Sequence, residues 1–262
     1  MGAGLFSDPL LVNPWFYAAA IAAVTAVGLG KGGLSGLGIL GVPILALAIS
    51  PVQAAAIILP ILIVQDIVSL WVFRGLWSLR LTGIMMLGGI VGVILGYALA
   101  ASVSTAAVEL SLGVICIAFG AQRLWNEWSG AGAGQPVAEW AGVVFGLVSG
   151  FTSQIAHAGG PPAQIFLMQR RVERDVFLGT GTLFFAILNW VKVPAYAALG
   201  QFTPHNLVAA AILFPVAVLS TLAGARLSRS LTGRTFFRVT YVLMLALGAK
   251  LGWDGVHGLW LA

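Results

Sequence analysis

The stretch "HAGGPP", residues 157–162, lies between the apolar runs "WAGVVFGLVSGFTSQIA" and "AQIFLM". Proline and paired glycines are poor residues for a helix interior in lipid, because every backbone polar group there needs a partner within the protein. The stretch therefore predicts a break between two half-length helices. A second interruption, "KGGLSGLG" at 31–38, lies between "PWFYAAAIAAVTAVGLG" and "ILGVPILALAIS" and predicts the same arrangement near the start of the chain.

The composition around these breaks is that of a membrane protein. Of the 262 residues, 60% are hydrophobic and 8% are charged, and the mean hydropathy is +1.01. A water-facing surface needs more charge than this, so the composition excludes a soluble domain with a single anchor. Six further apolar runs are long enough to span a bilayer, at about 52–73, 80–100, 105–124, 175–199, 206–226 and 236–254.

The two halves of the chain follow the same order of elements. In each half a broken pair of half-length helices precedes three full spans, and the "GVP" at 41–43 aligns with the "GPP" at 160–162. Each half makes an odd number of crossings, so the second copy is inverted relative to the first. We predict an all-α integral membrane protein of two inverted repeats, 1–125 and 141–262, joined by a cytoplasmic loop at 126–140.

The basic residues set the predicted orientation. When alternate loops are assigned to two sides, all ten arginines fall on one side, and no lysine or arginine falls in a loop on the other. Such an excess marks cytoplasmic loops, so both termini should face the periplasm or the outside. The net charge of +5 comes from these scattered residues and predicts no nucleic-acid partner. The start of the chain lacks a basic region, which predicts no cleaved signal peptide.

The breaks predict an anion-binding site near the membrane midplane. A half-helix exposes unpaired backbone N–H groups and a partial positive charge at its N-terminus, and glycine lets a ligand approach that backbone. Carriers built from inverted repeats place their substrate between such half-helix ends. The predicted substrate-binding residues are Lys31, Gly32, Gly33, Ser35, Gln65, Thr152, Ser153, Gln154, His157, Gly159, Gly160, Asn189 and Lys192.

Asp66 and Lys192 are ionisable residues near the centres of corresponding spans in the two halves. Such groups are costly in the membrane interior and normally face a cavity or each other. They form either a mutual ion pair or the proton carrier and anion contact of the site. Asp66 and His157 are the candidates for carrying a coupling proton.

Structural roles are also open for several residues. His157 fits a polar contact with a neighbouring helix, and Lys31 fits a topology signal that extends to the cytoplasmic interface. The run "GGIVGVILG" at 88–96 is typical of close helix packing. The single cysteine, Cys116, lies in an apolar run and fits helix packing, and one cysteine excludes both a disulfide within the chain and a cysteine-based metal site.

Both broken segments resemble those of a known family. "SGFTSQIAHAGGPP" at 149–162, followed by "LGTGTLFFAILNWVKVPAY" at 178–196, resembles the second-half motif of the sulfite exporter TauE/SafE family, and "GKGGLSGLGILGVPIL" at 30–45 is similar to its first-half motif. The resemblance covers nearly the whole chain. It implies a multi-pass permease of the bacterial inner membrane for small sulfur-containing anions, such as sulfite, thiosulfate or a short organosulfonate like sulfoacetate.

The resemblance also implies functional positions by motif. Lys31 and Asp66 have no assigned counterpart in the family pattern. The positions that match are Gly32, Gly33, Ser35, Gly36, Pro43, Thr152, Ser153, His157, Gly159, Gly160, Pro161, Pro162, Thr180, Asn189 and Lys192.

The predicted function is a secondary transporter, not an enzyme, that exports a small sulfur anion by alternating access around a midplane site. We expect the transporter to lie in the lipid bilayer and to use protons as its candidate coupling ion. No cofactor and no metal are predicted. A proton-coupled metal-cation permease would use Asp66, Glu109 and His157. An intramembrane serine hydrolase would use Ser35 of "GLSG" with His157 as its base. An ion channel also fits the broken helices.

The chain contains no G-x-x-x-x-G-K-[ST] loop, so the sequence does not support a self-contained ATP pump.

Overall fold

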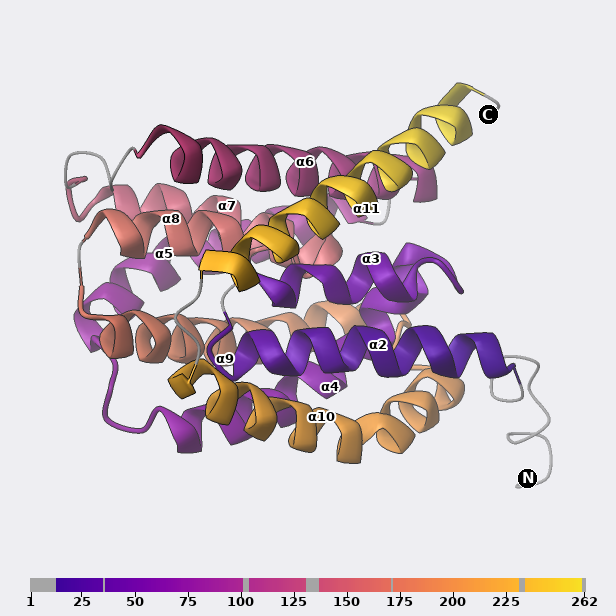
Figure 1. Ribbon diagram of the computed structural model, residues 1–262. Helices are drawn as coiled ribbons and strands as arrows, with labels where there is room; N and C mark the ends of the chain where they lie inside the picture. Colours follow the sequence, from indigo (N-terminus) through magenta and orange to yellow (C-terminus); the bar gives the residue numbers. More distant parts are fainter. Residues whose placement is uncertain are drawn as a thin grey trace.

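The computed structural model describes residues 13–34, 36–100, 104–130, 137–170, 172–230 and 234–260, which leaves Ser35 outside the described residues. Within these ranges the chain is helical and contains no strand, which confirms the all-α prediction (Figure 1). The helices are α2 (Pro14–Lys31), η1 (Leu37–Leu40), α3 (Gly41–Leu45), α4 (Pro51–Val72), α5 (Leu79–Ala100), α6 (Thr105–Ser129), α7 (Ala141–Ala156), α8 (Gly160–Gln169), α9 (Arg174–Ala198), α10 (Pro204–Ser230) and α11 (Arg234–Trp260).

Four helices in the described part of the chain are long and apolar enough to cross a membrane, namely α4, α5, α9 and α10. They correspond to four of the six full spans that the sequence predicts. The other two predicted spans also form helices, α6 and α11. These two are not among the four helices whose length and apolar composition suit a membrane crossing. The apolar helix α7 is shorter, with 16 residues.

The first predicted break follows α2, which ends at Lys31. Gly33 and Gly36 take φ angles of 111° and 107°, a conformation that side chains with a Cβ rarely adopt. The helical segment beyond this break is shorter than a half-length helix, because it consists of the four residues of η1 and the five residues of α3.

The second predicted break separates α7 from α8. α7 ends at Ala156, His157 turns the chain with φ 52°, and α8 begins at Gly160. His157 is the one non-glycine residue with positive φ among the described residues. Because α8 begins with "GPP", both prolines lie in its first turn, where the N–H that proline lacks has no helical partner to lose.

Three helix pairs approach each other closely through glycine: α5 with α7, α2 with α10, and α6 with α11. A Cβ added to Gly88 or Gly92 of α5 would lie 1.8 or 2.1 Å from a carbonyl oxygen of α7. A Cβ on Gly113 of α6 would lie 2.5 Å from the backbone nitrogen of Gly252 in α11. The packing role predicted for residues 88–96 is therefore confirmed.

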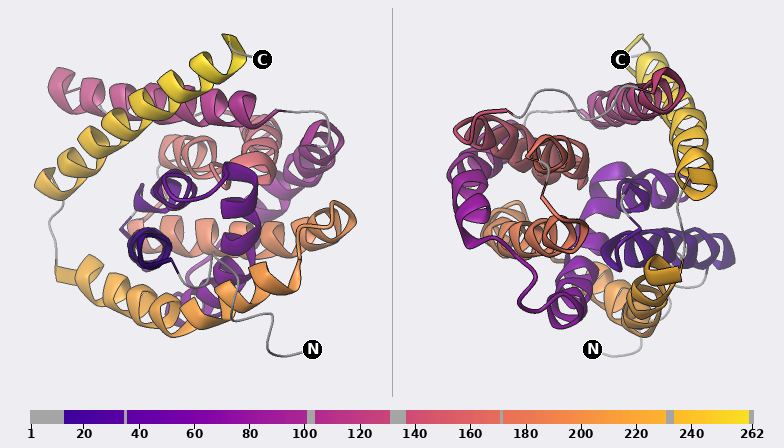
Figure 2. Two further views of the ribbon diagram at one scale, coloured as in Figure 1. Left: turned by 90° about the vertical axis from the view of Figure 1, so that its right-hand side faces the viewer. Right: turned by 60° about the vertical axis from the view of Figure 1, so that its left-hand side comes forward.

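The helix pair formed by α6 and α11 lies to one side of the bundle. The two helices cross each other (Figure 1), and the further views show them outside the remaining helices (Figure 2). Cys116 of α6 is fully buried there, next to Gly248 of α11. This confirms the packing role predicted for the cysteine.

The helices of the two halves make corresponding contacts. Taken in chain order and leaving out η1, the five helices of the first half correspond to the five of the second: α2 to α7, α3 to α8, α4 to α9, α5 to α10 and α6 to α11. Under this exchange the pair α5 and α7 becomes α10 and α2, and the pair α4 and α10 becomes α9 and α5. The pairs α4 with α9 and α6 with α11 exchange into themselves. The contact between α4 and α9 brings the central spans of the two halves together.

Candidate functional site

A cavity of about 130 Å³ lies where the two breaks approach each other. Gly33 and Gly36 of the first break and Gly160 of the second contribute to its wall. A single water needs roughly 10–15 Å³ of such space, so the cavity has room for a ligand of several non-hydrogen atoms. Its polar side chains are Lys31, Ser153, His157, Gln164, Thr182 and Asn189, and most of the remaining wall is apolar.

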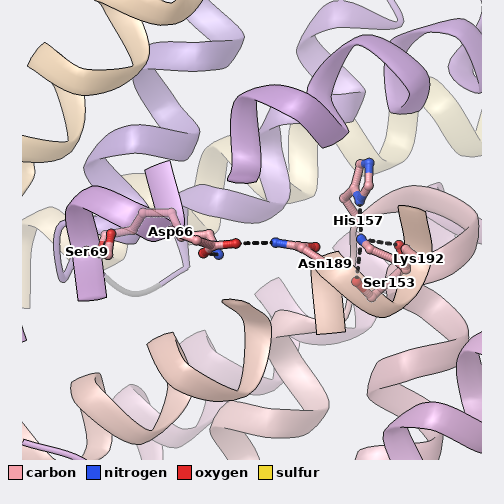
Figure 3. A network of polar contacts seen from close by, with 7 residues as sticks. Asp66, Ser69, Ser153, His157, Asn189 and Lys192 are labelled. Carbon is pink, nitrogen blue, oxygen red and sulfur yellow. Dashed lines mark hydrogen bonds and ion pairs between the residues drawn. The ribbon is translucent and has the colours of Figure 1, made fainter. Parts of the chain in front are cut away.

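Asp66 of α4 is the centre of a first buried polar cluster (Figure 3). Its Oδ1 forms an ion pair with Nζ of Lys31, and its Oδ2 accepts a hydrogen bond of 2.6 Å from Nδ2 of Asn189 in α9. Ser69 Oγ donates to the carbonyl oxygen of Lys31 at 3.1 Å, which holds the end of α2 against α4. The Asp66 side chain is 3% exposed, so the carboxylate lies behind Lys31 and Asn189.

Lys192 of α9 is the centre of a second buried cluster (Figure 3). Its Nζ lies 3.0 Å from Oγ and 3.2 Å from the carbonyl oxygen of Ser153, and 2.6 Å from Nδ1 of His157. Three acceptors match the three N–H donors of an ammonium group. Lys192 is completely buried, and no carboxylate of the described residues forms an ion pair with it.

The hydrogen bonds of His157 determine its tautomer. Its Nε2 lies 2.8 Å from the carbonyl oxygen of Ala55 in α4, and a carbonyl can only accept, so Nε2 carries a proton. In the neutral ring Nδ1 is then the acceptor for Lys192. The ring also stacks on Tyr196, with the centroids 5.8 Å apart. His157 therefore lines the cavity without a free ring donor for a ligand.

Ser153 is the residue that connects Lys192 to the cavity. Among the hydrogen bonds of the described residues, its Oγ accepts from Lys192 and makes no donation. The hydroxyl proton is thus left for an acceptor in the cavity, and the ammonium behind it polarises that proton. The arrangement can present the positive charge of a buried lysine to a ligand through one hydroxyl group.

The structure brings six of the predicted substrate-binding residues to the cavity wall. These are Lys31, Gly33, Ser153, His157, Gly160 and Asn189. Lys31 pairs with Asp66 there, and its side chain is 14% exposed. The mutual ion pair considered for Asp66 and Lys192 is not formed, because Asp66 faces Lys31 and Asn189.

Other predicted residues lie away from the cavity. Gly32 packs against α10, where a Cβ would lie 2.4 Å from Thr221 O, and Gly159 packs against α7, where a Cβ would lie 2.4 Å from Ser149 O. Gln65 Nε2 donates to the carbonyl oxygen of Val24. The remaining two are Thr152, which bonds carbonyls of its own helix, and Gln154, whose buried amide has no hydrogen-bond partner in the described part of the chain.

Sequence reasoning missed several positions of the cavity wall, among them Gln164 and Gly181. Gln164 lies four residues after Gly160, so both residues share one face of α8. Gly181 of α9 lines the cavity too. The spacing of four residues from Gly160 could have predicted that Gln164 faces the cavity. Gly181, in contrast, cannot be told apart in the sequence from a glycine that serves helix packing.

Two of the alternative functions depend on His157. In a serine hydrolase its ring would take a proton from Ser35, but Ser35 lies outside the described residues and both ring nitrogens already have partners. For a metal permease, at least three ligands must come together. Among the described residues, no group of three or more His, Cys, Asp or Glu side chains is placed to hold a metal ion.

Spanning helices, two helix breaks and buried charged clusters beside a cavity define the class of a membrane transport protein. Residues 18–251 match the family described as sulfite exporter TauE/SafE, so the chain belongs to this family. The family consists of transporters and not of enzymes.

One curated relative is a protein of Cupriavidus necator (strain ATCC 17699 / H16) named "Probable sulfite/organosulfonate exporter TauE", which is 29% identical over 167 residues. The match covers 62% of this chain and 62% of the relative. No solved structure matches the chain.

Proposed function

We propose that the protein is a secondary transporter of a small sulfur-containing anion, either sulfite or a short organosulfonate. Lys192 is the observation that carries this proposal. It is a completely buried cation without a carboxylate partner in the described part of the chain, and it lies directly behind the polar end of the cavity. A buried charge without a counter-ion is costly. An anion in the cavity would supply the missing charge.

The second break supports an anion at this place. α8 begins at Gly160, and the first N–H groups of a helix have no partner within it and carry a partial positive charge. A Cβ added to Gly160 would meet no atom closer than Gln164 Nε2 at 3.5 Å, so the space in front of this backbone is open. Gly160 thus leaves room for a ligand, whereas Gly159 makes room for α7.

The position of the cavity along α9 supports alternating access. The cavity wall includes Asn189 and continues along this helix to Phe177, three residues after Arg174 at the arginine-rich end. Beyond Asn189, His157 bonds Ala55 of α4 and closes the other direction. We propose that this arrangement corresponds to an inward-facing state. Export would require the contact between His157 and α4 to open.

The corresponding contacts of the two halves support the inverted repeats, with units 1–125 and 141–262. α2 begins and α11 ends at the same side in Figure 1, which agrees with an odd number of crossings in each half. With the arginine-rich loops in the cytoplasm, both termini would face the periplasm.

Coupling to protons through Asp66 or His157 stays a prediction. Both oxygens of Asp66 already have a partner, Lys31 and Asn189. Both ring nitrogens of His157 do too, Lys192 and the carbonyl oxygen of Ala55.

The proposal is tested by thermal unfolding of the purified protein with sulfite, thiosulfate, 2-hydroxyethanesulfonate, acetate and nickel at constant ionic strength. A ligand of the folded state stabilises it by RT ln(1 + [L]/Kd), about 2.7 kcal/mol at a hundredfold excess over Kd. We expect stabilisation by sulfite or 2-hydroxyethanesulfonate and not by acetate or nickel, and efflux of the stabilising anion from proteoliposomes. Stabilisation by nickel alone would replace this proposal by the metal permease.

A further inference from the structure

The charged groups around the cavity give a definite electrical balance. Among the described residues, the charged or titratable side chains at the two clusters are Lys31, Asp66, Lys192 and His157. The positive charge of Lys31 and the negative charge of Asp66 cancel within their ion pair. The polar side chains that line the rest of the wall, Ser153, Gln164, Thr182 and Asn189, are neutral.

The pair formed by Lys192 and His157 contributes one positive charge. Nε2 of His157 donates to Ala55, so the neutral ring accepts at Nδ1, and Nζ of Lys192 meets three acceptors, as an ammonium group does: Nδ1 and the Oγ and carbonyl oxygen of Ser153. With Lys192 as the ammonium and His157 neutral, the pair has a charge of +1. The site as a whole therefore offers a single uncompensated positive charge.

We propose that this balance makes the site selective for singly charged anions, and that Asp66 is the residue that sets this preference. The inference rests on the proposed function and narrows its substrate class. A monoanion would neutralise the site in the low-dielectric interior of the membrane. A dianion would leave one negative charge without a counter-ion, close to the carboxylate of Asp66, and buried charges of this kind are strongly unfavourable.

The proposal separates organosulfonates by their second functional group. A sulfonate with a neutral tail, such as 2-hydroxyethanesulfonate, carries one charge at all physiological pH values and would be preferred. Its hydroxyl fits among the neutral polar groups of the wall. Sulfoacetate is similar in size but has a carboxylate at the other end, so the site would disfavour it. Inorganic sulfate would be disfavoured for the same reason.

The test compares affinities for 2-hydroxyethanesulfonate and sulfoacetate at one pH, from the ligand dependence of thermal unfolding of the full-length protein. Asp66→Asn keeps a hydrogen-bonding side chain and raises the charge of the site from +1 to +2. The double variant Lys31→Gln/Asp66→Asn removes both charges of the ion pair and restores +1. Asp254→Asn, at the exposed ion pair of Lys250 and Asp254 on α11, is the matched control for loss of a carboxylate.

We expect the unaltered protein and the control to prefer 2-hydroxyethanesulfonate. We expect Asp66→Asn to raise the affinity ratio of sulfoacetate to 2-hydroxyethanesulfonate by on the order of tenfold or more. The double variant should return to the monoanion preference, with weaker binding of both ligands. A neutral packing role of Asp66 would not produce this reversal.

The outcomes distinguish the two proposals. Equal binding of both sulfonates by the unaltered protein, or an unchanged ratio in an Asp66→Asn variant that folds, would overturn the charge selectivity and leave the anion carrier in place. If Asp66→Asn does not fold, the double variant decides: preference for the dianion there would overturn the charge selectivity. Stabilisation by neither sulfonate, with stabilisation by nickel, would overturn the proposed function and this inference with it.

Discussion

Asn189 donates a 2.6 Å hydrogen bond to Asp66, although 123 residues separate them along the chain. The two residues occupy corresponding positions in the central spans of the two halves. Their contact therefore lies where α4 and α9 meet, and both halves contribute polar groups to the same buried cluster. Lys31 then places a charge from the first break at the wall of the cavity.

Ser153→Ala should weaken anion binding, because the hydroxyl that presents the charge of Lys192 to the cavity is removed. We expect a loss of about tenfold in affinity, the usual size for one hydrogen bond to a charged group. The matched control is Thr152→Ala, since the Thr152 hydroxyl bonds Val148 O and Ser149 O of its own helix. Calorimetric titration with 2-hydroxyethanesulfonate measures both variants. Equal losses would show that Ser153 has no special role.

Gly160→Ala and Gly159→Ala should separate ligand space from packing. A methyl group on Gly160 fits without close contacts, so this variant should fold normally but bind more weakly. A methyl group on Gly159 would lie 2.4 Å from Ser149 O and should reduce stability by about 1–3 kcal/mol. Thermal unfolding with and without ligand distinguishes the two effects. Normal binding by Gly160→Ala would remove the half-helix start from the site.

Lys192→Met should abolish ligand-dependent stabilisation while leaving the protein inserted. Lys192 has no counter-ion in the described part of the chain, so replacing it by an apolar side chain of similar length removes an unpaired buried charge, and the unliganded protein should keep most of its stability. Lys250→Met is the control, because Lys250 lies in an exposed ion pair on α11. If both variants lose binding equally, the charge acts through the general field and not through Ser153.

Gly92→Val should separate α5 from α7, because a Cβ at this position would lie 2.1 Å from Leu147 O. Gly83→Val on the same helix is the control, since no atom lies within 4 Å of its added Cβ. We expect a clear decrease in the thermal unfolding temperature for Gly92→Val and little change for Gly83→Val beyond helix propensity. Similar decreases for both would exclude a specific packing role.

The sequence predicted both breaks and the packing run at 88–96, because glycine and proline leave a strong local signal in an apolar chain. It also predicted that Lys31, Ser153, His157 and Asn189 gather near the breaks. It did not predict that Lys31 contacts Asp66, because pairing across helices depends on the azimuth of each side chain, which apolar runs do not reveal. The separate packing roles of Gly32 and Gly159 depend equally on the neighbouring helix.

The hydroxyl of Ser153 keeps the ammonium of Lys192 one group away from any ligand in the cavity. A carrier must release its cargo in every cycle, and direct contact with a buried ammonium would lengthen the residence time of the anion. In the proposed carrier, a charge transmitted through a neutral hydroxyl would attract the anion strongly enough to admit it and weakly enough to let it leave. The distance between the cation and the ligand would then set the turnover rate as much as the affinity.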